Sequence, residues 1–209
     1  MNIEQILEIA PVIPVVTIHD AAQAMPLAEA LRDGGVPVIE VTLRTPAALE
    51  AIERIAVGVD GVTVLAGTVC NATQVGESVA AGASGLVSPG LTASLAEAVA
   101  DARATWLPGI ATASDILRGL EYGLAHFKLF PATVAGGTGA LRAFAGPFPT
   151  VKFCPTGGID LAGAPTYLSL PNVACVGGSW VAPDELVQAA DWTAIRANAG
   201  LARRLRPAG

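Results

Sequence analysis

Eight short apolar runs recur along the 209-residue chain at a nearly constant interval, and most are rich in β-branched residues. Their first residues lie 21 to 26 positions apart, which leaves room for one helix between each run and the next. The runs are PVIPVV from Pro11, VPVIEVTL from Val36, VTVLAGT from Val62, SGLVSP from Ser84, TWLPGI from Thr105, HFKLFP from His126, TVKFCPTG from Thr150 and NVACVGGS from Asn172. Alternating strands and helices of this kind predict a parallel sheet.

Eight βα units predict a closed (β/α)₈ TIM barrel, formed as a single domain over residues 1–209 with a short N-terminal helix. An open doubly wound sheet is the alternative, but no glycine fingerprint follows the first strand, which disfavours it. Two helix starts can be read directly. Thr45–Pro46 places a capping hydroxyl before a proline, and Thr112 with Asp115 resembles a capping box.

Composition excludes several classes of function. Only 14% of the residues are charged, well below the usual quarter, so the chain either buries much of its surface or forms an oligomer. A net charge of −6 offers no basic surface for nucleic acid. The first ten residues contain no basic residue, unlike a signal peptide, and glycines and prolines interrupt the long uncharged runs. We expect a soluble cytoplasmic protein without a membrane or nucleic-acid partner.

Cysteine and histidine usage gives little support for a metal site. Cys70, Cys154 and Cys175 lie in apolar runs without metal-ligand spacing, which is typical of reduced core cysteines. The two histidines, His19 and His126, lie far apart in the sequence, and no carboxylate-rich cluster accompanies them. A zinc-dependent aldol site is therefore not expected.

The chain has only two lysines, and one of them interrupts an apolar strand. Alternation places Lys128 on the opposite face from Phe127 and Leu129, pointing into the barrel. A lysine can also extend its amine to solvent, but an enclosed barrel offers no easy route. Burial disfavours the charged form, and a neutral amine attacks carbonyl carbons, so a Schiff-base role is predicted. Lys152 begins its strand and should lie at the opposite, structural end.

Polar residues also mark the second strand and several strand ends. In VIEVTLR, Glu40, Thr42 and Arg44 share one face, so Glu40 should point inward with Lys128. A buried Glu–Arg ion pair is the structural alternative. Thr68 ends the third strand and Pro89 lies in the SPG motif that ends the fourth. Catalytic groups of such barrels lie at the C-terminal ends of strands.

Double glycines end the seventh and eighth strands, in PTGGI (155–159) and VGGSW (176–180). Barrels often bind phosphate after these two strands, and glycine lets backbone N–H groups approach an anion closely. Ser179 can add a hydroxyl. Together the two motifs predict a phosphate site.

Seven motifs together resemble one known family over nearly the whole chain. They are EVTLR (40–44), GTV (67–69), SPG (88–90), LPGI (107–110), FKLFPA (127–132), FCPTGG (153–158) and GGSW (177–180). In this order they are similar to the bacterial class I aldolases that act on 2-keto-3-deoxy-6-phosphogluconate (KDPG) and on 4-hydroxy-2-oxoglutarate (KHG).

The resemblance implies a metal-free lyase of the Entner–Doudoroff pathway whose only covalent group is an imine on Lys128. It also implies a phosphorylated keto-acid substrate, a cytoplasmic location and a homotrimer. It makes Lys128 and Glu40 catalytic, Glu40 as the general acid/base. The residues it assigns to substrate binding are Arg44 (the pyruvate carboxylate), Thr68, Pro89, Phe130, Thr156, Gly157, Gly158, Gly178 and Ser179.

Two alternatives remain open at this stage. The isomeric 2-dehydro-3-deoxy-6-phosphogalactonate aldolase differs only in the C4 configuration of its substrate. A non-catalytic phospho-ligand-binding barrel would explain the double glycines but not Glu40, Arg44 and Lys128. Two segments, TIHD (17–20) and TVAGG (133–137), depart from the family pattern near the expected barrel mouth and bear on substrate range.

Overall fold

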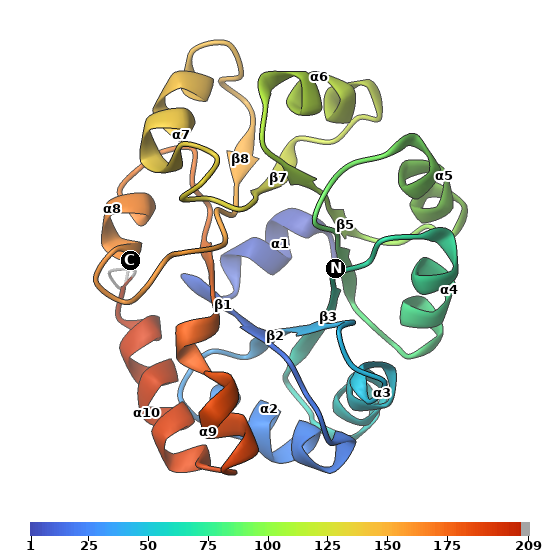
Figure 1. Cartoon of the computed structure of the whole chain (residues 1–209), viewed down its shortest axis with the longest axis vertical. Helices are drawn as coiled ribbons and strands as arrows, with labels where there is room; N and C mark the ends of the chain where they lie inside the picture. Colours follow the sequence, from blue (N-terminus) through green and yellow to red (C-terminus); the bar gives the residue numbers. More distant parts are fainter. Residues whose placement is uncertain (206–209) are drawn as a thin grey trace.

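The computed structural model describes residues 1–205 and shows a ring of parallel strands surrounded by helices (Figure 1). The strands of this part are β1 (Val12–Val16), β2 (Val38–Thr42), β3 (Thr63–Gly67), β4 (Gly85–Val87), β5 (Trp106–Leu107), β6 (Gly109–Ile110), β7 (His126–Leu129), β8 (Lys152–Phe153) and β9 (Val176–Gly178). The helices are α1 (Ile3–Glu8), α2 (Ala24–Asp33), α3 (Ala48–Gly58), α4 (Ala72–Ala80), α5 (Ala93–Asp101), α6 (Ala113–Glu121), α7 (Gly137–Ala145), α8 (Ala164–Leu168), α9 (Asp184–Gln188) and α10 (Trp192–Arg203), with the 3₁₀ turns η1 (Ala21–Gln23) and η2 (Ser179–Val181).

The strands close into a barrel through two junctions. Hydrogen-bonded neighbours run β5-β4-β3-β2-β1-β9 in one sheet and β6-β7-β8 in the other, all of them parallel. β5 and β6 are the fifth predicted strand, divided at Pro108, which has no N–H for the ladder. At the other junction the Gly177 N–H donates to the Pro155 carbonyl at 2.9 Å. The predicted (β/α)₈ barrel is confirmed, and the open sheet is wrong.

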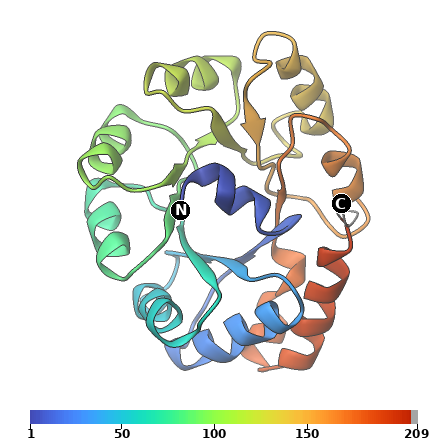
Figure 2. The same ribbon diagram turned by 180° about the vertical axis from the view of Figure 1, so that it is seen from behind.

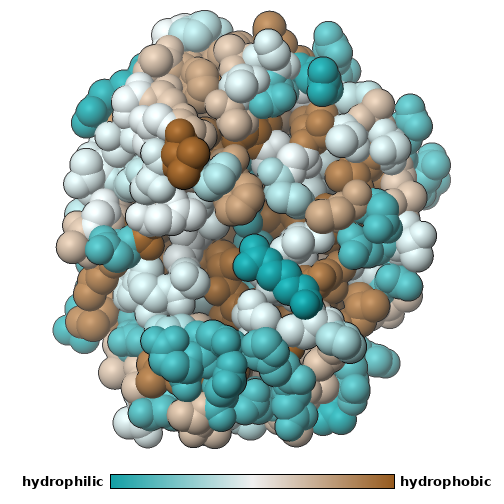
Figure 3. Space-filling model, viewed as in Figure 1, coloured by the Kyte–Doolittle hydropathy of each residue, from teal (hydrophilic) through white to brown (hydrophobic). Residues whose placement is uncertain are grey.

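The short N-terminal helix α1 was also predicted, and it covers the end of the barrel where the strands begin (Figure 2). Its Ile6 and Leu7 are fully buried. Ile6 reaches into the barrel, because a Cβ placed on Gly85 of β4 would lie 3.3 Å from Ile6 Cδ1. Figure 3 shows the opposite face, where a hydrophilic side chain lies across apolar ones near the middle. The C-terminal mouth is thus the end left free of α1.

The two predicted helix starts have different outcomes. Thr112 caps α6, and its hydroxyl and backbone form the predicted capping box with Asp115. The start expected at Thr45–Pro46 is wrong, because α3 begins at Ala48 and has no side-chain cap. The Thr45 hydroxyl instead donates to the Ile18 carbonyl, which joins the loops that follow β1 and β2.

The apolar side chains of β7 and β8 pack towards the helices, so the residues that alternate with them face into the barrel. Phe127 and Phe153 are fully buried. Phe153 stacks on Phe144 of α7 with ring centroids 5.9 Å apart. Because side chains alternate along a strand, Lys128 points to the opposite side, into the barrel. None of the helices in residues 1–205 is long and apolar enough to cross a membrane.

Candidate active site

Lys128 and Glu40 meet inside the barrel, although they come from β7 and β2. The Lys128 Nζ atom lies 2.9 Å from Glu40 Oε1 and 3.1 Å from Oε2. Lys128 is 5% exposed and Glu40 is 4% exposed, so the lysine does not extend to solvent. The buried Glu–Arg pair considered from the sequence is also wrong, because the partner of Glu40 is Lys128 and Arg44 is exposed.

A glycine makes room for this pair. Glu40 and Leu65 face each other in the β2–β3 ladder, and Gly67 ends β3. A Cβ on Gly67 would lie 2.6 Å from Glu40 Cγ and would also meet the carboxylate. Any larger residue at position 67 would therefore displace Glu40 from Lys128. On the other side, the Phe130 ring centroid lies 5.3 Å from Lys128 Nζ, which adds a cation–π contact.

A pocket of about 160 Å³ gathers most of the predicted substrate-binding residues near the C-terminal mouth. The predicted residues that line it are Arg44, Phe130, Thr156, Gly157, Gly158 and Ser179. Three other predicted residues do not line it. Thr68 follows β3 with a φ of 62°, Pro89 is exposed after β4, and a Cβ on Gly178 would meet the Trp180 indole.

The double glycine after β8 forms an anion-binding geometry. Gly157 and Gly158 have φ values of 104° and 75°, a conformation that side-chain-bearing residues rarely adopt. Their N–H groups donate to no other residue of the described chain, and neither does the Ser179 hydroxyl. Successive free backbone N–H groups in left-handed conformation are typical of anion sites in proteins.

Arg44 supplies a cation to the same pocket. It follows β2, is exposed and lines the pocket with Thr156. Within residues 1–205 its guanidinium forms no hydrogen bond or ion pair. An unpaired guanidinium can hold a carboxylate through two parallel N–H bonds. The pocket therefore offers separate groups for two anionic ends of one molecule.

Of the three cysteines predicted to be core residues, Cys154 and Cys175 are buried, but Cys70 is exposed, so the prediction is wrong for Cys70. The interaction of the buried pair with Lys128 was not predicted. The pKa of the Cys154 thiol is lowered, mainly by a hydrogen bond with Cys175; burial opposes this, and the Lys128 charge adds to it. Cys154 Sγ also lies 3.8 Å from Thr156 Oγ1. The signal was available, because Lys152, Cys154 and Thr156 alternate along one strand and share its inner face.

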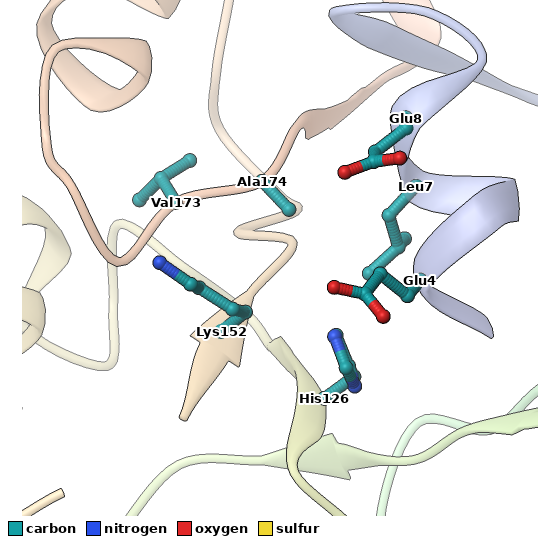
Figure 4. Close-up of a pocket in the computed structure, with 7 residues that line it drawn as sticks. All are labelled: Glu4, Leu7, Glu8, His126, Lys152, Val173 and Ala174. Carbon is teal, nitrogen blue, oxygen red and sulfur yellow. The ribbon is translucent and has the colours of Figure 1, made fainter. Parts of the chain in front are cut away.

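A second pocket, of about 210 Å³, lies at the opposite end of the barrel (Figure 4). Glu4 and Glu8 of α1 line one side of it, and His126 points towards Glu4, whereas the Lys152 side chain points away from both glutamates. The pKa of His126 is lowered, first by burial and also by Lys152, while Glu4 and Glu8 oppose the shift. Lys152 is exposed and donates to the Pro171 carbonyl at 2.9 Å. It lies at the N-terminal end, as predicted.

The histidines lie apart from the lysine pair. His19 Nε2 is 3.1 Å from Asp184 Oδ1 in an exposed pair, and His126 lines the pocket beneath α1. No group of three or more histidine, cysteine, aspartate or glutamate side chains in residues 1–205 is arranged to hold a metal ion.

A buried lysine beside a carboxylate inside a (β/α)₈ barrel fits a class I aldolase, in which a lysine amine forms the covalent intermediate. The family model for KDPG and KHG aldolase matches residues 3–198. The chain belongs to this family.

Relatives agree over most of their length. A 2-dehydro-3-deoxy-phosphogluconate aldolase from Pseudoalteromonas atlantica is 51% identical over 88% of this chain and 86% of its own. The KDPG aldolase structure from Zymomonas mobilis is 48% identical, with a TM-score of 0.94 over 100% of this chain and 99% of its own. The KDPG aldolase structure from Legionella pneumophila is 44% identical, with a TM-score of 0.94 over 96% of this chain and 97% of its own. It holds pyruvate, captured at low pH as a covalent carbinolamine intermediate.

Proposed function

We propose that this chain reversibly cleaves 2-dehydro-3-deoxy-6-phosphogluconate to pyruvate and glyceraldehyde 3-phosphate through an imine on Lys128. By the same chemistry it cleaves 4-hydroxy-2-oxoglutarate to pyruvate and glyoxylate. The observation that carries the proposal is the buried contact of 2.9 Å between Lys128 Nζ and Glu40 Oε1. The similarity to aldolases across most of the chain supports it.

The lysine–glutamate contact suggests how the reaction begins. Glu40 accepts a proton from the Lys128 ammonium, which frees the amine to attack the C2 ketone of the substrate. Glu40 then gives this proton to the hydroxyl of the resulting carbinolamine, which leaves as water and gives a protonated imine. Pyruvate captured as a carbinolamine in the Legionella pneumophila structure is an intermediate of the same type.

The protonated imine then acts as the electron sink for carbon–carbon cleavage. Glu40, through a water molecule, removes the C4 hydroxyl proton, the C3–C4 bond breaks and the aldehyde leaves. The bonding electrons form an enamine on Lys128. Glu40 returns a proton to C3, and water hydrolyses the imine to release pyruvate. General acid–base help of this kind contributes a factor of ~10²–10⁴.

The pocket groups fit the two ends of such a substrate. We propose that Arg44 holds the carboxylate, which fixes C2 beside the Lys128 amine. Thr156 contacts the substrate between its ends. The phosphate then lies against the N–H groups of Gly157 and Gly158 and the Ser179 hydroxyl, with Gly178 adjoining. Thr68, Pro89 and Phe130 line the part of the site that holds the pyruvoyl group.

A cleavage assay with both C4 epimers tests the substrate. Pyruvate release is followed by coupled reduction with 2-dehydro-3-deoxy-6-phosphogluconate, its galactonate epimer and 4-hydroxy-2-oxoglutarate. We expect the gluconate to give the highest kcat/KM. A higher value for the galactonate epimer would contradict the proposal in favour of the isomeric aldolase. Release from none of the three would favour a non-catalytic phospho-ligand barrel.

We infer that the chain forms a homotrimer and is located in the cytoplasm. The low content of charged residues, 14%, and the family resemblance support a homotrimer, which light scattering would report as three times the chain mass of 21.0 kDa. Cys70, Cys154 and Cys175 form no disulfide within residues 1–205, which supports a reducing compartment, the cytoplasm.

A further inference from the structure

The segment TVAGG (133–137) has no role in the chemistry described above, yet it borders the glycine turn. The chain after β7 runs beside the chain after β8. The Ala132 N–H donates to the Thr156 carbonyl at 2.8 Å, and the Thr133 N–H donates to the Gly157 carbonyl at 3.2 Å. These two bonds fix the backbone of Thr133 next to Gly157 and Gly158.

The side chain of Thr133 lies against Gly158. A Cβ built on Gly158 would meet the Thr133 hydroxyl oxygen before any other atom, and Thr133 Cγ2 would lie 2.8 Å away. The hydroxyl is therefore the part of Thr133 that faces the turn. Thr133 is exposed, and its hydroxyl bonds to no other residue within 1–205. A free O–H thus lies next to Gly158, whose N–H is also free.

We propose that Thr133 is a further anion-binding residue, whose hydroxyl donates to the substrate phosphate and raises the preference for phosphorylated over unphosphorylated keto acids. The proposal rests on the proposed function for its substrate, but the anion site itself does not. A hydroxyl bond to a charged oxygen is stronger than one between neutral groups. The glycine turn donates only from its backbone, which a substitution does not remove. The Thr133 hydroxyl belongs to a side chain, so its contribution to anion binding can be tested by mutation.

Two substitutions separate the hydroxyl from the shape of the side chain. Thr133→Val keeps the size and removes the O–H, whereas Thr133→Ser keeps the O–H. Thr138→Val, on α7, is the matched control outside the turn. We measure kcat/KM for 2-dehydro-3-deoxy-6-phosphogluconate and for 4-hydroxy-2-oxoglutarate, which carries no phosphate. We also measure the Kd of inorganic phosphate by calorimetry.

We expect Thr133→Val to lower the ratio of the two kcat/KM values about tenfold, mainly through KM for the phosphorylated substrate. The phosphate Kd should rise by a similar factor, and Thr133→Ser and Thr138→Val should stay close to wild type. An unchanged ratio together with an unchanged phosphate Kd would overturn the inference. So would an equal loss on both substrates, or a loss with Thr133→Ser as large as with Thr133→Val.

The phosphate measurement distinguishes a failure of this inference from a failure of the proposed function. If the wild type cleaves neither substrate but Thr133→Val still weakens phosphate binding, the aldolase assignment fails and the anion site stands. If the wild type cleaves both substrates and Thr133→Val changes neither the ratio of the kcat/KM values nor the phosphate Kd, the role of Thr133 is wrong and the aldolase stands.

Discussion

At the scale of single residues, the site depends on one charge pair that is almost completely buried. Lys128 is 5% exposed and Glu40 is 4% exposed, so water screens their charges only weakly. Removing one partner of such a pair leaves the other buried without compensation, which is costly. The pair therefore affects stability as well as chemistry, and an experiment on either residue must separate the two.

Glu40→Gln removes the charge but limits the loss of stability, because glutamine keeps the shape and accepts a hydrogen bond from Lys128. We expect kcat for cleavage to fall by a factor of ~10²–10⁴, since an amide cannot take the proton that Glu40 carries. KM should change little. Glu53→Gln, an exposed change on α3, is the control. Wild-type kcat in Glu40→Gln would contradict the role of Glu40 as acid/base.

Sequence reasoning identified Lys128 and Glu40 because alternation along a strand fixes which face a side chain takes. It could not decide whether Lys128 or Arg44 is the partner of Glu40, because alternation places Arg44 on the same face of the strand as Glu40. In the structure β2 ends at Thr42, so Arg44 lies beyond the strand, at the mouth of the barrel. Cys154 follows β8 and Cys175 precedes β9, so only the three-dimensional register reveals the hydrogen bond between them.

At the scale of elements, the sequence predicted a helix start correctly where the residue that bonds to the cap lies close to it in the sequence. The α6 capping box joins Thr112 to Asp115, three residues away, and both were predicted. Thr45 looked like a cap, but its hydroxyl bonds to Ile18 of another loop. The Thr45 hydroxyl, which the local sequence pattern assigned to a helix cap, therefore bonds to a carbonyl from a distant part of the chain. The division of the fifth strand at Pro108 follows from the missing N–H.

The capping box gives a pH-dependent prediction. Burial alone would raise the pKa of Asp115, but hydrogen bonds from Ala111 and Thr112, with the charge of Arg118, outweigh it and lower the pKa below 3.8. The carboxylate therefore stabilises the fold above pH 3.8, and this contribution is lost as the pH falls through the lowered value.

We expect Asp115→Ala to reduce the free energy of unfolding by about 1 kcal/mol at neutral pH, measured by urea denaturation. The difference from wild type should shrink as the pH falls below 3.8. Ser114→Ala, an exposed change in the same helix, should change the free energy by less than about 0.5 kcal/mol. A difference that persists unchanged at low pH would contradict the role of the Asp115 charge.

At the scale of the whole molecule, the barrel assigns its two lysines to opposite ends. Lys128 lies inside with Glu40, towards the mouth that carries the glycine turn. Lys152 lies beneath α1, exposed and bonded to a backbone carbonyl. The regular strand spacing alone predicted this division, because it fixes how far each lysine lies from the start of its strand. That α1 covers the N-terminal end of the barrel could be seen only in the structure.

The most direct test of the account traps the covalent intermediate. The protein is incubated with pyruvate, reduced with borohydride and digested, and the adduct is located by peptide mass. Lys128→Arg and Lys152→Arg are the matched pair, because guanidinium cannot condense with a ketone. We predict a single adduct on Lys128 in the wild type, its loss in Lys128→Arg and its retention in Lys152→Arg. No adduct in the wild type, or an adduct on Lys152, would contradict the central claim.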